Sequence, residues 1–262
     1  MKYAELTSPE IGRLAPGLIA VLPLAAIEQH GDHLPVVTDT AIADELAHRL
    51  DLALPDRIAV LPTLWCGSSH HHLSFPGTLS LRSETYVNVL IDLVESLIHT
   101  GFRRIFLLNC HGGNQTPFAE ALYRLNVAHR GENEPWIAAA SYWNMASREL
   151  AAQTFMESPK ISHACEYETS LMMALRLDWI KGTGSGEDGT IGSRYYDPLN
   201  YVPSRAVVSQ SFDQLSGNGA LGTPEKATEE KGRQLYPLIT DVIVDFIKEF
   251  ATWQRRTTSS IS

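Results

Sequence analysis

Four short runs of apolar residues stand out along the chain, each bounded by polar or turn-forming residues. They span residues 18–24, 58–61, 104–109 and 136–141. None of them alternates between apolar and polar positions, which is typical of strands covered on both faces of a sheet. The pattern therefore predicts a mainly parallel, buried sheet.

The segments between these runs carry apolar residues at helical spacing. The clearest helix is residues 83–100, where Ser83 can cap the start and Gly101 can end the helix. Further helices are expected over residues 39–50, 114–129, 166–177 and 225–253, the last with a break or kink at Pro237. Strands that alternate with helices predict an α/β fold. We expect a single domain over residues 1–254 and a flexible tail over 255–262.

Composition narrows the class of protein. The net charge of −9 argues against nucleic acid or an anionic membrane as a partner. There is no apolar run of the length of a transmembrane helix and no signal peptide core after Met1. The three cysteines, Cys66, Cys110 and Cys165, form no C-x-x-C motif. These features predict reduced cysteines and a cytoplasmic location.

Acidic and imidazole side chains follow the first predicted strand. The segment Glu28-Gln29-His30-Gly31-Asp32-His33 comes soon after residue 24, and Asp39 follows it. Such groups are costly to bury unless a partner compensates them, and a divalent metal is the usual partner. Asp32 is expected to be exposed. This segment predicts a metal-dependent enzyme.

A second polar cluster follows the third strand, from Asn109 through His111 to Asn114. Sites in open α/β sheets form beyond the carboxyl ends of the strands, so His111 should lie at the same edge as Glu28 and His30. Asn114 is placed to cap the next helix.

Two further clusters and one long connection remain. One cluster runs from His163 to Ser170 at a predicted helix start, and the other is the histidine triplet at residues 70–72. His70 and His71 are interpreted as solvated loop residues, and Glu168 as a structural acceptor or support. The stretch 181–223, rich in Gly, Tyr, Pro and Ser, predicts a functional or assembly segment.

Mixed carboxylate and imidazole ligands suit two metal ions bridged by a carboxylate and a water, with zinc, manganese or iron favoured over calcium. Such a pair can polarise a carbonyl and lower the pKa of a water. Hydrolysis of an amide is the natural reaction, with a histidine that is not a ligand moving the proton.

Taken together, the motifs resemble the creatininase family of metal-dependent amidohydrolases, over residues 1 to about 250. The matching segments are Glu28-Gln29-His30-Gly31-x-His33-Leu34-Pro35 with Asp39, His72-x-x-Phe75-Pro76-Gly77-Thr78, Asn109-x-His111-Gly112-Gly113-Asn114, His163-Ala164-x-Glu166-x-Glu168-Thr169-Ser170 and Gly219-x-x-Gly222-x-Pro224-x-x-Ala227.

The resemblance implies a three-layer α/β/α fold and a two-metal site. Glu28 and His111 would hold one metal, His30 the other, and Asp39 would bridge them. Creatininase proper takes its last ligand from a glutamate at the position of Gly113. Members with the His-Gly-Gly-Asn motif instead use the first glutamate of the later motif, which is Glu166 here.

The remaining motif residues receive supporting roles by the same resemblance. His163 would be the catalytic proton shuttle. The residues expected to bind substrate or to support the ligands are His33, His72, Gly112, Gly113, Trp143 and Glu168.

The resemblance also bears on substrate and assembly. Gly112 and Pro159 stand where creatininase proper has aromatic residues, so we expect a small amide, cyclic or open-chain, other than creatinine. A peptidase or formamide deformylase of the same family is an alternative, and a non-catalytic metal-containing protein that binds a small molecule is another. A homo-oligomer, commonly a hexamer in this family, is expected.

Overall fold

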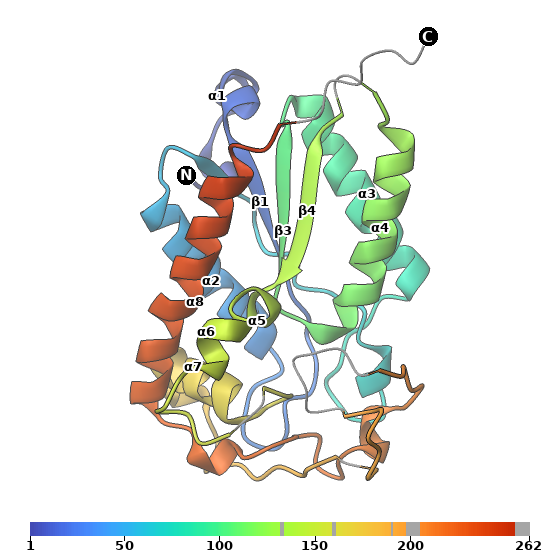
Figure 1. Ribbon diagram of the computed structural model, residues 1–262, viewed down its shortest axis with the longest axis vertical. Coiled ribbons are helices and arrows are strands. Elements are labelled where there is room, and N and C mark those ends of the chain that lie inside the picture. The colour runs from blue at the N-terminus through green and yellow to red at the C-terminus, as the bar shows by residue number, and fades with distance from the viewer. Residues whose placement is uncertain (132–133, 159–160, 190, 198–204, 255–262) are drawn as a thin grey trace.

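A parallel sheet of four strands forms the centre of the molecule, in the order β2-β1-β3-β4 (Figure 1). The computed structural model describes residues 1–131, 134–158, 161–189, 191–197 and 205–254, so the predicted tail at 255–262 lies outside the described residues. The strands are β1 (Ile19–Leu24), β2 (Ile58–Val60), β3 (Arg104–Asn109) and β4 (Trp136–Ser141). Each lies within one residue of its predicted bounds.

Helices cover both faces of this sheet (Figure 1). Helices α2, α7 and α8 lie on one face, and α3 and α4 on the other. A hydrophobic core lies on each face of the sheet, and alternate residues of one strand belong to different cores. Val21 packs toward α2 and α8, whereas Ala20 and Leu22 pack toward α3 and α4. Because both faces are buried, the strands carry no polar alternation. The α/β/α fold is confirmed.

Helices α2, α3, α4 and α7 agree with predicted helices to within a few residues, α8 begins later than predicted, and the short helices α1, α5 and α6 were not predicted. The helices are α1 (Ser8–Leu14), α2 (Thr38–Ala53), α3 (Ser83–Thr100), α4 (Gln115–Ala128), α5 (Tyr142–Met145), α6 (Ser147–Ala151), α7 (Glu166–Arg176) and α8 (Glu229–Phe250).

The last helix departs from its prediction at two points. A separate 3-10 turn occupies Pro224–Lys226, and α8 begins only after Thr228, whose hydroxyl accepts a hydrogen bond from Lys231 N at 3.2 Å. Helix α8 also runs through Pro237 without a break. Pro237 lies on the exposed side of the helix, so water can satisfy the carbonyl that loses its partner.

The carboxyl ends of the strands lie together near the middle of the molecule in Figure 1, above the loops that fill its lower part. Leu24 pairs with Asn109, and Asn109 pairs with Ser141, so β1, β3 and β4 end level with one another. Single bridges from Leu24 to Leu64 and from Ile27 to Leu79 place the segment after β2 beside them. Four segments distant in sequence therefore meet at one edge.

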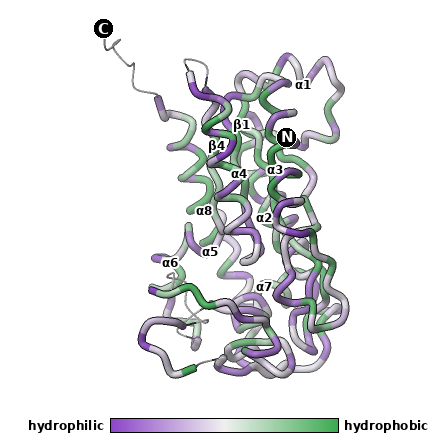
Figure 2. The backbone as a smooth tube through the Cα atoms, turned by 90° about the vertical axis from the view of Figure 1, so that its right-hand side faces the viewer, coloured by the Kyte–Doolittle hydropathy of each residue, from purple (hydrophilic) through white to green (hydrophobic). Residues whose placement is uncertain are grey.

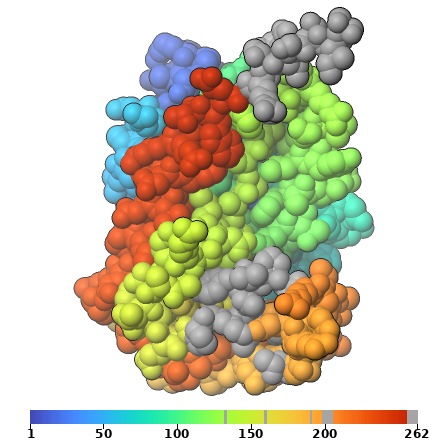
Figure 3. Space-filling view, in the orientation of Figure 1, coloured from blue at the N-terminus to red at the C-terminus, as the bar shows by residue number. Residues whose placement is uncertain are grey.

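The hydropathy of the chain differs between the sheet and the loops at its carboxyl end. In Figure 2 the strands are largely green, whereas the loop-rich lower part contains more white and purple. In Figure 3, α8 covers the left of the front face, and the orange segment that includes Gln210 lies at the lower right, below the sheet. Among the described residues, no helix is long and apolar enough to cross a membrane.

Candidate metal centre

A single carboxylate, that of Asp39, lies between two imidazole rings. Its Oδ1 is 3.1 Å from His30 Nε2, and its Oδ2 is 3.1 Å from His111 Nδ1. Glu28 Oε1 is 3.2 Å from the same nitrogen of His111. All four residues are at most 2% exposed. The structure thus brings together four of the five residues predicted as ligands.

The fold explains this convergence. Glu28 and His30 lie on the loop after β1, and His111 lies just beyond β3, its neighbour in the sheet. Asp39 is the second residue of α2, in the first helical turn, where the helix dipole favours a negative charge.

Backbone carbonyls fix the orientation of three rings. His30 Nδ1 lies 3.2 Å from Glu28 O, His111 Nε2 lies 3.1 Å from Ser68 O, and His163 Nε2 lies 2.7 Å from Gln29 O. A carbonyl only accepts, so these nitrogens donate and the other ring nitrogen faces the carboxylates. Metal-binding histidines are held in this way in proteins.

Several buried atoms of the cluster have no hydrogen-bond partner, namely Glu28 Oε2, His30 Nε2 and Asp39 Oδ2. They approach one another closely but are not aligned for hydrogen bonds. Leaving such groups unsatisfied is unfavourable, and an ion among them would remove that cost. Nitrogen and oxygen donors of this type suit zinc or manganese. The residues therefore fit a divalent metal.

The electrostatics of the cluster also favour a bound cation. Burial alone would lower the pKa of His30, but the Asp39 carboxylate outweighs it and raises the pKa to about 9. Burial would raise the pKa of Asp39, yet the neighbouring charges of His30 and His111 hold it below its ordinary value. In the folded protein, positive charge therefore stabilises the buried carboxylates, and either protonated histidines or a metal ion can supply it.

The two glutamates at the start of α7 exchange the places expected of them. Glu166 points away from the cluster: its carboxylate accepts from Ser158 N at 2.5 Å and from Lys231 Nζ at 2.6 Å. Glu168 points into it, with Oε2 3.9 Å from His30 Nε2. Residues two apart on a helix are about 200° apart around its axis, so only one of them can face the cluster. The expectation that Glu166 joins the other four is therefore corrected.

Glu168 has the environment of a functional carboxylate. Burial raises its pKa to about 7, although the charge of His30 opposes this shift. Its Oε2 also accepts from Ala164 N at 2.5 Å. A carboxylate oxygen of Glu168 can join nitrogens of His30 and His163 in one group of ligand atoms within 4.8 Å of one another.

His163 faces the same space. Its Nδ1 lies 3.6 Å from Glu28 Oε1. Burial, aided by the charge of His30, lowers the pKa of His163 to about 3, so the ring is neutral. With Nε2 donating to Gln29 O, the lone pair of Nδ1 is directed at the carboxylates.

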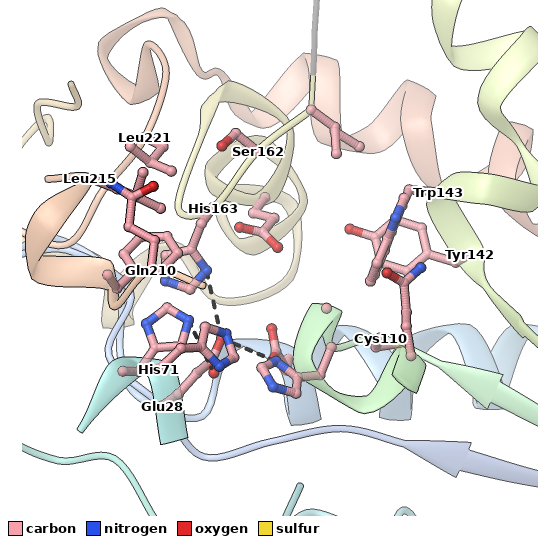
Figure 4. A pocket seen from close by; sticks show the side chains of 18 of the residues that line it. Glu28, His71, Cys110, Tyr142, Trp143, Ser162, His163, Gln210, Leu215 and Leu221 are labelled. Atoms are coloured by element: carbon pink, nitrogen blue, oxygen red, sulfur yellow. Dashed lines mark ion pairs between the residues drawn. The ribbon is translucent and has the colours of Figure 1, made fainter. Parts of the chain in front are cut away.

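A cavity of about 340 Å³ opens over the cluster. Figure 4 shows Tyr142, Trp143 and Cys110 on one side of it and His71, His163 and Gln210 on the other. Of the residues expected to line it, those found there are His72, Gly112, Trp143 and Glu168.

Two of the supporting residues lie behind the cavity. His33 Nε2 lies 2.8 Å from Thr169 Oγ1, so this ring braces the start of α7. A Cβ at Gly113 would come within 2.1 Å of Ser68 O, so no ligating side chain fits at that position. Pro159 lies outside the described residues.

Sequence reasoning missed three residues of this region. Asn114 does not cap α4 with its side chain; it donates to Ala25 O at 3.1 Å and accepts from Ser68 N at 3.0 Å, joining two loops of the site. Gln29 and His71 also belong to it. Their position directly beside Glu28, His30 and His72 in the sequence was the available signal.

Comparison with known proteins identifies the family to which this chain is similar. The sequence model of the creatininase family, described as creatinine amidohydrolase, matches residues 4–247. The chain is 28% identical to the creatinine amidohydrolase of Pseudomonas putida, over 94% of this chain and 95% of that protein. It is also 28% identical to a mycofactocin precursor peptide peptidase of Mycobacterium tuberculosis, over 96% of this chain and 91% of that protein.

Solved structures of creatininases also resemble this chain. A creatininase variant of zinc-zinc type has a TM-score of 0.76 and 25% identity, covering 96% of this chain and 98% of that one. A manganese creatininase has a TM-score of 0.73 at 25% identity, covering 96% of this chain and 99% of that one. The chain belongs to the creatininase family. It is accordingly a metal-dependent hydrolase of carbon–nitrogen bonds.

Proposed function

We propose that the protein is a dinuclear metal-dependent amidohydrolase that cleaves a C–N bond in a small amide. The observation that supports this most directly is the Asp39 carboxylate, which reaches His30 with one oxygen and His111 with the other. Asp39 would bridge two ions. Glu28 and His111 would complete one position, and His30 and Glu168 the other, with Glu168 in the role expected of Glu166.

The metal supplies the electrophilic part of the chemistry: when bound, divalent ions lower the pKa of a water and polarise a carbonyl oxygen. The chain supplies the proton transfer. His163 Nδ1 is unprotonated and faces the cluster, so it can accept the proton of the attacking water and deliver it to the leaving nitrogen.

Gln29 sets up this proton transfer. Its Oε1 accepts from Gly31 N at 2.9 Å, so its amide nitrogen must face Gly219 O at 3.0 Å and His72 Nδ1 at 2.8 Å. The Gln29 backbone carbonyl meanwhile fixes the tautomer of His163. One residue therefore orients two imidazoles of the site.

The cavity indicates the class of substrate. At about 340 Å³ it suits a small molecule or the end of a chain, and its described lining includes no Lys or Arg. The aromatic rings of Tyr142, Trp143 and Phe212 offer flat apolar contact. An uncharged or cationic amide therefore fits better than a phosphorylated one.

A peptide end is the second candidate. The chain is as similar to the mycofactocin precursor peptide peptidase as to the creatinine amidohydrolase, at 28% identity in each case. A cavity of about 340 Å³ could accept the last residues of a peptide.

Two measurements test the proposal. Elemental analysis should find about two divalent ions per chain, and His111→Ala should lower both that content and the activity. Turnover should then be assayed on creatinine, formamides, small lactams and short peptides. Absence of stoichiometric metal would contradict the proposal, and a metal-replete protein inert on this panel would favour a binding function instead.

Assembly and location stay predictions. The expected homo-oligomer, a hexamer by family resemblance, is tested by sedimentation, where a monomer alone would contradict it. The cytoplasmic location is tested by cell fractionation.

A further inference from the structure

The three consecutive histidines of the 3-10 turn His70–His72 have different surroundings. His70 Nδ1 lies 2.6 Å from Ser80 Oγ, and its side chain is exposed. His72 Nδ1 receives the Gln29 amide at 2.8 Å. The ring of His71, between them, has no hydrogen-bond partner among the described residues, and it is half-buried at the cavity wall. Only the middle ring therefore has both nitrogens available.

His71 lies beside one of the two proposed metal positions. Ligand atoms of Glu28, His71 and His111 lie within 4.8 Å of one another. The rings of His71 and His111 are stacked, with centroids 5.8 Å apart and planes 18° from parallel. In Figure 4 the His71 ring lies next to Glu28 and faces the cavity. Donors this close can share one ion after a small adjustment.

Gly113 explains why a ring can stand here. A Cβ at this position would come within 2.7 Å of His71 Cε1, 2.5 Å of His111 Nε2 and 2.1 Å of Ser68 O. A side chain at residue 113 is therefore excluded by the Ser68 carbonyl and by the rings of His71 and His111.

We propose that His71 is a further protein ligand of the metal position formed by Glu28, Asp39 and His111. This inference rests on the proposed function. The ring would add a neutral nitrogen donor to two carboxylates and one imidazole. Such a donor leaves the charge of the site unchanged while strengthening its hold on a zinc-like ion over magnesium or calcium.

The test compares metal affinity in matched variants. Apo-protein is titrated with Zn²⁺ against a chromophoric chelator, and with Co²⁺ by visible absorption. His71→Phe keeps the ring but removes the nitrogens, and should weaken one of the bound ions by at least about 10-fold, with a changed cobalt spectrum. His71→Asp restores a donor and should recover most of that affinity. His70→Gln is the control and should bind as the wild type does.

The outcomes separate this inference from the function on which it rests. Wild-type affinity and an unaltered cobalt spectrum in His71→Phe would overturn the His71 ligand, even if activity fell. If His71→Phe does not fold, His71→Gln takes its place with the same expectation. Failure of the wild-type protein to bind metal would instead overturn the proposed function itself.

Discussion

The two ends of the central sheet differ in whether their buried polar groups find hydrogen-bond partners within the chain. At the amino end of β3, the half-buried Arg104 donates to Phe250 O at 3.1 Å and to Trp253 O at 2.9 Å. These carbonyls belong to the end of α8 and the residues just after it, where a helix has unpaired acceptors and a partial negative charge. The charge is therefore satisfied within the chain.

At the carboxyl end the same strands lead to groups that the chain does not satisfy. Glu28 Oε2 and Asp39 Oδ2 are buried without a hydrogen-bond partner. The contrast shows where stability and function lie. The polar group at the amino end stabilises the fold, whereas under the proposed function those at the carboxyl end would bind metal ions. Four predictions test this contrast.

The largest effect is expected from the pair of glutamates on α7. Glu168→Gln should lower metal content and reduce kcat/KM by more than about 100-fold, because groups that merely orient ligands already contribute about 10–100-fold. Glu166→Gln should leave metal content unchanged and destabilise the fold by about 2 kcal/mol, since Lys231 loses a buried partner. Elemental analysis, kinetics and urea unfolding measure these effects. If the two variants exchanged phenotypes, the assignment would be wrong.

Metal removal should have the next largest effect. Stripping the protein with a chelator removes the ions that compensate the buried carboxylates. Re-adding Zn²⁺ at a hundredfold excess over its Kd should stabilise the fold by about 2.7 kcal/mol. Scanning calorimetry would record this as a rise in Tm. The control is Asp39→Asn, whose Tm should respond much less to Zn²⁺.

Gln29 should give a smaller effect, confined to catalysis. Gln29→Leu should lower kcat by about 10–100-fold, because the hydrogen bond from the Gln29 amide that fixes the tautomer of His72 is lost. The metal content should stay near that of the wild type. Gln29→Glu also loses the amide donor and should behave alike. Full activity in Gln29→Glu would show that volume, and not hydrogen bonding, is what matters at this position.

The smallest effect is expected at the opposite end of the sheet. Arg104→Met removes two hydrogen bonds to carbonyls and should cost about 1–2 kcal/mol of folding stability. Activity per folded molecule and metal content should not change. A loss of metal in this variant would mean that the two ends of the sheet are coupled.

The sequence alone determined the fold and much of the site. Strand bounds could be predicted closely because strands buried on both faces are continuous apolar runs, and such runs are local in sequence. Glu28, His30, Asp39 and His111 could be predicted because parallel strands end at one edge, so residues that follow different strands must meet there. Local pattern and topology carry that information.

Tertiary structure alone decided which groups face the cluster. The choice between Glu166 and Glu168 depends on the rotation of α7, which the packing of α7 against α2 and α8 fixes. The difference between His70, His71 and His72 depends on contacts with Ser80, ten residues from His70, and with Gln29, which is distant in sequence. Side-chain direction results from contacts across the whole fold, and for that reason a local motif identified the candidate residues but not their orientation.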